Sequence, residues 1–185
     1  RNDIQFISKY SNFWKEIQNP DETANSAYGN LIFSTKNEFG FSEYEWAISS
    51  LIKDKHTRQA VFHFNNKSHQ YLNNKDFVCT MYGNFHIRQD TLYLSIFMRS
   101  NDAIWGTPTD VAFFCTLLIH TYKLLLTHYP TLKLGSYTHV SNSYHIYDRH
   151  YDLVNRMLNA PFIPVKIPDI IRFLINDDGK PTSDL

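Results

Sequence analysis

The sequence predicts an α+β fold, in which a mixed or antiparallel β-sheet packs against one long buried helix. Residues 78–88 and 92–99 have the pattern of a β-hairpin that turns at Gln89 and Asp90, and the second arm is largely apolar on both faces. Residues 107–129 have helical length and are apolar on most sides. Because such segments are typical of protein interiors, we expect this strand and this helix at the centre of the fold.

A shorter helix is predicted upstream of the hairpin. Ser42 and Glu45 have the spacing of a capping box, and Phe41 is placed to pack on Trp46. The apolar face of this helix would carry Tyr44, Ile48, Leu51 and Ile52.

Thr107 and Pro108 mark the start of the long helix, with the threonine as its cap and the proline in the first helical position. A further helix is expected to start at Asn142 or Ser143 and to run through Leu158.

Two additional strands are predicted at residues 59–64 and 132–140. Near the carboxyl end, Pro161, Pro164 and Pro168 favour an extended stretch with one edge strand.

Composition limits the classes of protein to consider. The 185 residues suit one domain spanning 1–185, and 18 basic residues balance 18 acidic ones, so no overall field attracts the chain to nucleic acid or membrane. No apolar run is long enough to span a bilayer. Cys79 and Cys115 lack metal-type spacing, so we expect no metal site and a reducing, cytoplasmic setting. Because the chain begins with Arg1, we expect it to be truncated at its amino end, and truncation at the carboxyl end stays open.

Cys79 is the candidate nucleophile. A buried structural thiol is the common role of a cysteine, and Cys115, among apolar helix residues, fits that role. Cys79 differs because Arg99 lies on the neighbouring hairpin arm and Arg58 lies upstream. Positive charge lowers a thiol pKa and increases the thiolate fraction that can attack an electrophile.

The order of these residues resembles the thymidylate synthase family. The resemblance extends from about Trp14 to Leu158 and is most specific at Cys79, at residues 99–102 with Gly106, and at residues 145–147. It implies the family's fold and a reaction at the 5-position of a pyrimidine nucleotide, with 5,10-methylenetetrahydrofolate as co-substrate. A folate-dependent transferase is therefore expected.

The resemblance also implies a role for each matching residue. Cys79 would add to C6 of the pyrimidine, Tyr28 would lie beside it, and Asp102 would organise proton transfer next to the folate ring. Trp14 would line the folate side of the cavity together with Asp102. The substrate would contact Arg58, Arg99, Ser100, Asn101, Asp110, His145 and Tyr147.

Within the substrate set, Arg99 and Ser100 would hold the 5′-phosphate, for which an arginine fork and a hydroxyl are suited. His145 and Tyr147 would bind the sugar 3′-hydroxyl. Arg58 would reach into the site of a second subunit, which implies a homodimer.

Asp110 bears on the identity of the base. Thymidylate synthases carry asparagine at this position, whereas the phage deoxycytidylate hydroxymethylases carry aspartate. A carboxylate can accept from the 4-amino group of cytosine, but it would oppose O4 of uracil with a second acceptor. A structural role is also open, because Asp110 would stand at the third position of a helix that Thr107 caps.

Several positions depart from the family pattern. Thr80 replaces the usual histidine after the nucleophile, as in the phage hydroxymethylases, while Asn84 and Gln59 replace a glutamine and an arginine. The general-base glutamate and a phosphate-loop arginine would lie upstream of Arg1, and the segment that closes over the folate is not recognisable in residues 177–185.

The favoured function is hydroxymethylation of dCMP, or of CMP, in the cytoplasm, including that of an infected host cell. Thymidylate synthesis from dUMP and a non-catalytic nucleotide-binding role remain open alternatives. The expected partners are a pyrimidine nucleoside monophosphate, folate and a second copy of the chain.

Overall fold

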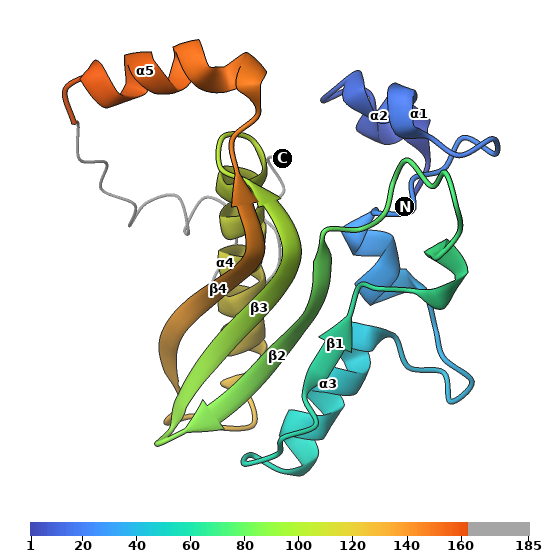
Figure 1. The fold of residues 1–185 in the computed structure, drawn as a ribbon. Coiled ribbons are helices and arrows are strands. Elements are labelled where there is room, and N and C mark those ends of the chain that lie inside the picture. The colour runs from blue at the N-terminus through green and yellow to red at the C-terminus, as the bar shows by residue number, and fades with distance from the viewer. Residues whose placement is uncertain (163–185) are drawn as a thin grey trace.

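The computed structural model describes residues 1–162. Within these residues, helices alternate with four strands that form a single sheet (Figure 1). In chain order the elements are α1 (Ile4–Ile7), α2 (Phe13–Ile17), the π-helix η1 (Asn30–Ser34), α3 (Glu43–Lys53), β1 (Val61–His63), the 3₁₀ helix η2 (Lys67–His69), β2 (Thr80–Arg88), β3 (Thr91–Asp102), α4 (Gly106–Leu125), β4 (Lys133–His145), the 3₁₀ helix η3 (Asp148–His150) and α5 (Tyr151–Asn159).

The sheet is mixed, as the sequence predicted, and its strand order is β1-β2-β3-β4. Strands β1 and β2 are antiparallel, β2 and β3 form the expected hairpin, and β3 and β4 are parallel. Gln89 and Asp90 form the two-residue turn with φ values of 50° and 58°, which suits a turn that follows the twist of its strands. Helix α4 makes the crossover that a parallel pair requires. The prediction that β3 is an inner strand is confirmed.

Helices α3 and α4 pack on one face of the sheet and enclose the core (Figure 1). The largest fully buried side chains come from both layers, including Phe62 and Phe85 of the sheet and Phe114 of α4. The two helices are joined where the Tyr44 hydroxyl lies 2.9 Å from Thr121 Oγ1. This two-layer arrangement confirms the predicted fold class.

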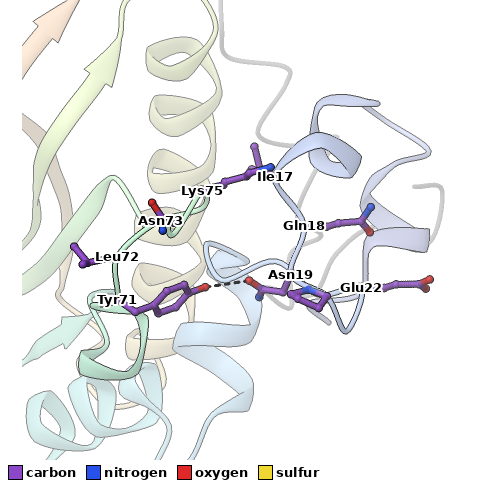
Figure 2. Close-up of a pocket in the computed structure, with 9 residues that line it drawn as sticks. Ile17, Gln18, Asn19, Glu22, Tyr71, Leu72, Asn73 and Lys75 are labelled. Atoms are coloured by element: carbon purple, nitrogen blue, oxygen red, sulfur yellow. Dashed lines mark hydrogen bonds between the residues drawn. The ribbon is translucent and has the colours of Figure 1, made fainter.

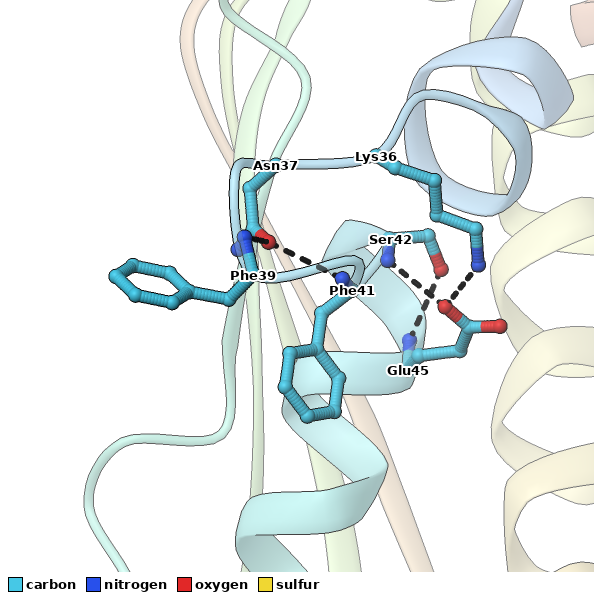
Figure 3. Close-up of polar contacts among 6 residues, drawn as sticks. All are labelled: Lys36, Asn37, Phe39, Phe41, Ser42 and Glu45. Atoms are coloured by element: carbon cyan, nitrogen blue, oxygen red, sulfur yellow. Dashed lines mark hydrogen bonds and ion pairs between the residues drawn. The ribbon is translucent and has the colours of Figure 1, made fainter.

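Helix α3 begins as the capping box predicted (Figure 3). Ser42 Oγ accepts from the Glu45 amide at 3.2 Å, and the Ser42 amide donates to Glu45 Oε2 at 2.8 Å. Phe41 packs edge-on against Trp46, with ring centroids 6.1 Å apart. Tyr44, Ile48 and Leu51 of the predicted apolar face are buried, whereas Ile52 is 38% exposed.

Helix α4 differs from the prediction at both ends. It begins at Gly106 rather than behind a Thr107 cap, so Pro108 and Asp110 stand later in the helix than expected. Asp102 supplies the carboxylate at this helix start, accepting from the amides of Ile104 and Trp105. The helix ends at Leu125, and only one side of it is buried among the described residues. Within residues 1–162, its buried side packs on the sheet, in agreement with the predicted long core helix.

Strand β4 is longer than predicted, and the helix expected from Asn142 or Ser143 is wrong there. The strand continues to His145, and α5 starts only at Tyr151. The reason is tertiary, because β3 runs on to Asp102 and offers ladder partners as far as the Asp102–His145 pair. Pairing with a long inner strand overrides the capping signal of the polar residues.

The remaining sequence predictions have mixed outcomes. Strand β1 covers residues 61–63 of the predicted 59–64. The extended stretch at Pro164 and Pro168 lies outside the described residues. Among residues 1–162, no helix is long and apolar enough to cross a membrane.

Candidate active site

The predicted site residues gather at the end of the sheet where β2 begins and β3 and β4 end (Figure 1). Cys79 immediately precedes β2, and its carbonyl accepts from the Arg99 amide at 2.9 Å. Ser100 pairs with Ser143, and Asp102 pairs with His145. The hairpin and the parallel β3–β4 pair thus bring three separate chain segments together.

Arg99 binds the segment that carries the nucleophile. Its Nη2 lies 3.8 Å from Cys79 Sγ and donates to the Phe77 carbonyl at 2.6 Å, while Nε donates to the Val78 carbonyl at 3.0 Å. The guanidinium also lies over the Phe77 ring at 5.1 Å. These contacts hold a fixed positive charge against a half-buried thiol.

Burial sets the direction of the thiol pKa. It raises the pKa of Cys79, with a further upward contribution from the Asp110 and Asp76 charges, and Arg99 opposes the change. The expectation that arginine lowers the thiol pKa is therefore right for the effect of Arg99 and wrong for the net direction. Arg99 therefore favours the thiolate against the effect of burial.

Asp110 is the buried carboxylate of the site, at 9% exposed. Its Oδ2 accepts from Asn101 Nδ2 at 2.7 Å, and its Oδ1 accepts from the Tyr28 hydroxyl at 3.3 Å. Burial raises the pKa of Asp110 to about 6, although the hydrogen bonds from Asn101 and Tyr28 favour the ionised form. The carboxylate is directed into a polar network instead of capping the helix, so the structural reading of Asp110 as a helix-start residue is not what its contacts show.

Tyr28 connects Asp110 to the start of β2. Its hydroxyl lies 2.6 Å from Thr80 Oγ1, so a proton donated by Thr80 leaves the Tyr28 proton free for Asp110. The ring packs against Phe64 and Phe114 at centroid distances of 4.9 and 5.8 Å. Burial, followed by the Asp110 charge, raises the pKa of Tyr28 well above its usual range, which keeps it a neutral donor.

Asp102 and His145 lie side by side at the ends of β3 and β4. Burial would raise the pKa of Asp102, but the amides of Trp105, Ile104 and Gly106, with the nearby His150, lower it overall. The His145 ring packs edge-on against Tyr147 with centroids 4.9 Å apart. An ionised carboxylate and two polar rings therefore border the site on this side.

Two predicted residues stand apart from this group. Arg58 is exposed, and among residues 1–162 no hydrogen bond or ion pair joins it to the site. Trp14 is half-buried on α2, where its ring contacts Phe13. Neither residue is brought into contact with Cys79 within one chain.

A hollow on the surface also lies apart from Cys79. A cavity of about 610 Å³ separates the segment after α2 from the loop before β2, and the Tyr71 hydroxyl donates across it to Asn19 Oδ1 at 3.3 Å (Figure 2). Its lining contains none of the predicted site residues. Among residues 1–162, no group of three acidic, histidine or cysteine side chains is placed to hold a metal.

Sequence reasoning missed the partners that complete the network. Thr80 was noted only as a departure from the family, and Thr107 only as a helix cap. Thr107 Oγ1 instead donates to Asn101 Oδ1, and it lies 3.1 Å from the Asp102 carbonyl. The signal available was chemical, since both hydroxyls are close in sequence to a residue already singled out.

The fold is an α+β sheet with two helices on one face, and Cys79, Arg99 and Asp102 lie at one end of that sheet. A profile of the thymidylate synthase family matches residues 1–173, so the chain belongs to this family.

The chain is similar to several characterised proteins. It is 29% identical over 148 residues to the deoxycytidylate 5-hydroxymethyltransferase of Enterobacteria phage T6, covering 77% of this chain and 59% of that protein. It is 28% identical to the T2 enzyme of the same name, covering 80% and 61%, and 28% identical to the deoxyuridylate hydroxymethyltransferase of Bacillus phage SP01, covering 80% and 40%.

A solved structure has the same fold. Thymidylate synthase A of Bacillus subtilis superposes with a TM-score of 0.69 at 19% identity, covering 88% of this chain and 58% of that one. The chain thus spans about three fifths of the phage T6 and T2 relatives.

Proposed function

We propose that the protein transfers a hydroxymethyl group to C5 of a cytidylate, with dCMP as substrate and CMP as the ribonucleotide alternative. Methylenetetrahydrofolate would supply the carbon and water the hydroxyl oxygen. The observation that carries this proposal is the buried Asp110 carboxylate, which is held by Tyr28 and Asn101 and is close enough to Cys79 to raise its pKa.

Covalent addition would start the reaction. The Cys79 thiolate adds to C6 of the base, and the electron pair of the C5–C6 bond makes C5 nucleophilic. C5 then takes up the one-carbon unit at the oxidation level of formaldehyde. Loss of the C5 proton and of tetrahydrofolate leaves an exocyclic methylene, water adds to it, and elimination of Cys79 restores the aromatic ring.

Asp110 supports cytosine as the base. Its carboxylate carries acceptors that the 4-amino group can use, and the polar groups around it already provide two donors. Opposed to O4 of uracil, the ionised carboxylate would leave two acceptors facing each other in a buried site, which costs about 1–3 kcal/mol. Two similar phage proteins bear the name deoxycytidylate 5-hydroxymethyltransferase, which supports the same choice.

A uracil nucleotide is the alternative substrate. The similar protein of phage SP01 is a deoxyuridylate hydroxymethyltransferase, and similar proteins of Symbiobacterium thermophilum and Mycoplasma genitalium are thymidylate synthases. The thymidylate reading would replace the water of the last step by a hydride.

The border of the site suits the other ligands of this reaction. Asp102 is ionised and fixed by backbone amides, and the half-buried Trp14 offers an aromatic face, so these two residues would hold and orient the folate. Arg99 with Ser100 would take the phosphate, and His145 with Tyr147 would take the sugar hydroxyl. The folate, when bound, supplies the one-carbon unit.

A homodimer would complete the site. Arg58 is exposed and apart from its own Cys79, so it is free to serve a partner copy. The sheet face opposite α4 carries stacked aromatic pairs, Tyr82 with Phe97 at 4.6 Å and His86 with Tyr93 at 5.1 Å. No helix among residues 1–162 covers this face, which makes it the surface on which a second sheet would pack.

Mass spectrometry of the reaction products tests the proposal. The protein at its natural length is incubated with methylenetetrahydrofolate and dCMP, CMP or dUMP, in water enriched in heavy oxygen. We expect a hydroxymethylated cytidylate that carries the heavy oxygen. A methylated uridylate with no label would overturn the proposal in favour of thymidylate synthesis.

A further inference from the structure

Asp110 belongs to a largely buried chain of polar groups that begins at Thr107 and passes through Asn101. The Thr107 hydroxyl donates to Asn101 Oδ1, and the other end of the same amide, Nδ2, donates to Asp110 Oδ2 at 2.7 Å. Asn101 is 3% exposed, so water does not compete for either end of its amide. Each group therefore has its partner in the protein, and the loss of one changes the next.

The direction of the Asn101 amide decides what Asp110 faces. In the observed direction a nitrogen donor lies against the carboxylate, which favours the ionised form. If the amide turned over, its oxygen would oppose Asp110 Oδ2, and only a protonated carboxyl could bond to it. The hydroxyl of Thr107 stabilises the first direction because it donates to the amide oxygen.

The same hydroxyl has a second acceptor within reach, the Asp102 carbonyl at 3.1 Å. A hydroxyl carries one proton, so donation to Asp102 would leave its oxygen free to accept from a reversed Asn101 amide. The direction in which the Thr107 hydroxyl donates therefore determines the direction of the Asn101 amide. Donation to Asn101 Oδ1, with the amide nitrogen donating to Asp110, corresponds to the arrangement with an ionised Asp110.

Gly106 leaves room for this chain. A Cβ atom at position 106 would lie 3.2 Å from Asn101 Nδ2 and 3.8 Å from Asp110 Oδ2, tighter than ordinary contact for the first of these atoms. The helix start therefore supplies both the hydroxyl that orients the amide and the space in which the amide lies.

We propose that Thr107 is a positioning residue that sets base discrimination by orienting Asn101 against Asp110. The link to discrimination between cytosine and uracil rests on the proposed function. The orientation of the Asn101 amide rests on its contacts with Thr107 and Asp110. Thr107 influences the choice of base only through Asn101, which contacts Asp110.

Other titratable groups face the same carboxylate and stay unchanged when Thr107 is replaced. Tyr28 donates to Asp110, and Cys79 and Tyr137 are within its electrostatic influence. A change confined to Thr107 therefore reports on the amide and not on these neighbours.

The test compares Thr107→Val with Thr107→Ser. Valine keeps the shape and removes the donor, whereas serine keeps the donor. The affinities of dCMP and dUMP are measured by isothermal titration calorimetry between about pH 5 and about pH 8. This range includes the pKa of Asp110, which burial raises to about 6. Thr109→Val is the matched control, because Thr109 lies on the same turn but is exposed and donates only to the Trp105 carbonyl at 2.9 Å.

We expect Thr107→Val to lower the dCMP-to-dUMP affinity ratio roughly twofold to tenfold, the effect of losing one hydrogen bond to the neutral Asn101 amide. The pH at which the ratio falls should also move upward, because the carboxylate loses a fixed donor. Thr107→Ser should restore both values, and Thr109→Val should change neither.

The inference is overturned if valine lowers the melting temperature but leaves the ratio and its pH dependence as in the unchanged protein, or if serine fails to rescue. Failure of the proposed function looks different. The unchanged protein would then prefer dUMP, while the valine and serine variants would still differ in the pH dependence of whichever nucleotide binds.

Discussion

At the scale of single residues, Asp110 is the group whose replacement separates recognition of the base from packing. We expect Asp110→Asn to shift the preference from cytosine to uracil nucleotides, because an amide presents a donor to O4. One mispaired buried contact corresponds to about 1–3 kcal/mol, or roughly 5- to 150-fold in specificity. The measurement is the ratio of kcat/KM for dCMP over dUMP in both proteins.

The pH dependence provides the control for this substitution. Since burial raises the pKa of Asp110 to about 6, the carboxylate is ionised above that pH and gains a proton, hence a donor suited to O4, below it. Discrimination against uracil should therefore weaken as the pH falls through about 6. In Asp110→Asn this inflection should disappear. A ratio that neither moves with the substitution nor varies with pH would leave Asp110 without a role in choosing the base.

The two cysteines give a second contrast at this scale. Cys79→Ser should abolish turnover and leave nucleotide binding within about tenfold, because an alcohol does not readily form the required anion. Cys115→Ala is the control, because Cys115 is a half-buried thiol whose pKa is raised by burial. This substitution should leave turnover intact and lower the free energy of unfolding by about 1 kcal/mol or less. Turnover by Cys79→Ser would remove the covalent mechanism.

At the scale of the elements, the sequence predicted those features that depend on residues close together in the chain. The capping box of α3 and the turn at Gln89 and Asp90 involve residues close in sequence, so both could be predicted. The antiparallel hairpin then places Arg99 beside Cys79. The pairing of Asp102 with His145 could not be predicted, because it depends on the register of two parallel strands separated by a helix.

The network of Asn101, Thr107 and Asp110 was out of reach for a related reason. The sequence pattern places Thr107 at a helix cap, and only the actual start of α4 at Gly106 turns its hydroxyl toward Asn101. Because helix boundaries predicted from sequence are uncertain by a few residues, the partner of a side chain in the first turn cannot be predicted.

The capping box of α3 yields a prediction for this scale. Ser42→Ala should lower the free energy of unfolding by about 1 kcal/mol, because the Glu45 amide loses its acceptor. The control is Ser49→Ala. Ser49 lies inside the same helix and does not cap it, and alanine is a better helix former than serine. Unfolding in urea at pH 7 measures both.

The pH of that experiment follows from Glu45. Its hydrogen bond from Lys36, with the Ser42 amide, lowers the pKa of Glu45 to about 2, so its stabilising effect is present above the usual glutamate range and is lost only as the pH falls through about 2 (Figure 3). The box is therefore intact near neutrality. Equal losses in the two serine variants would show that the cap contributes nothing specific.

At the scale of the whole molecule, the sheet has one covered face and one face of stacked aromatic rings. Val140 lies on the second face, beside Phe97 in the ladder, and is 37% exposed on β4, the edge strand of the sheet that residues 1–162 form. If two copies pack through this face, Val140→Glu places a charge in each half of the interface. We expect a dimer in analytical ultracentrifugation that weakens roughly tenfold or more in this variant.

Phe39→Glu is the control for added charge, because Phe39 is 77% exposed in the loop before α3 (Figure 3). It should leave the dimer unchanged. Arg58→Ala tests the shared site directly. If this exposed arginine serves the partner's site, its removal should lower nucleotide affinity without altering sedimentation. A protein that sediments as a monomer at micromolar concentration, or an Arg58→Ala variant that binds nucleotide as tightly as the unchanged protein, would contradict a site shared between two copies.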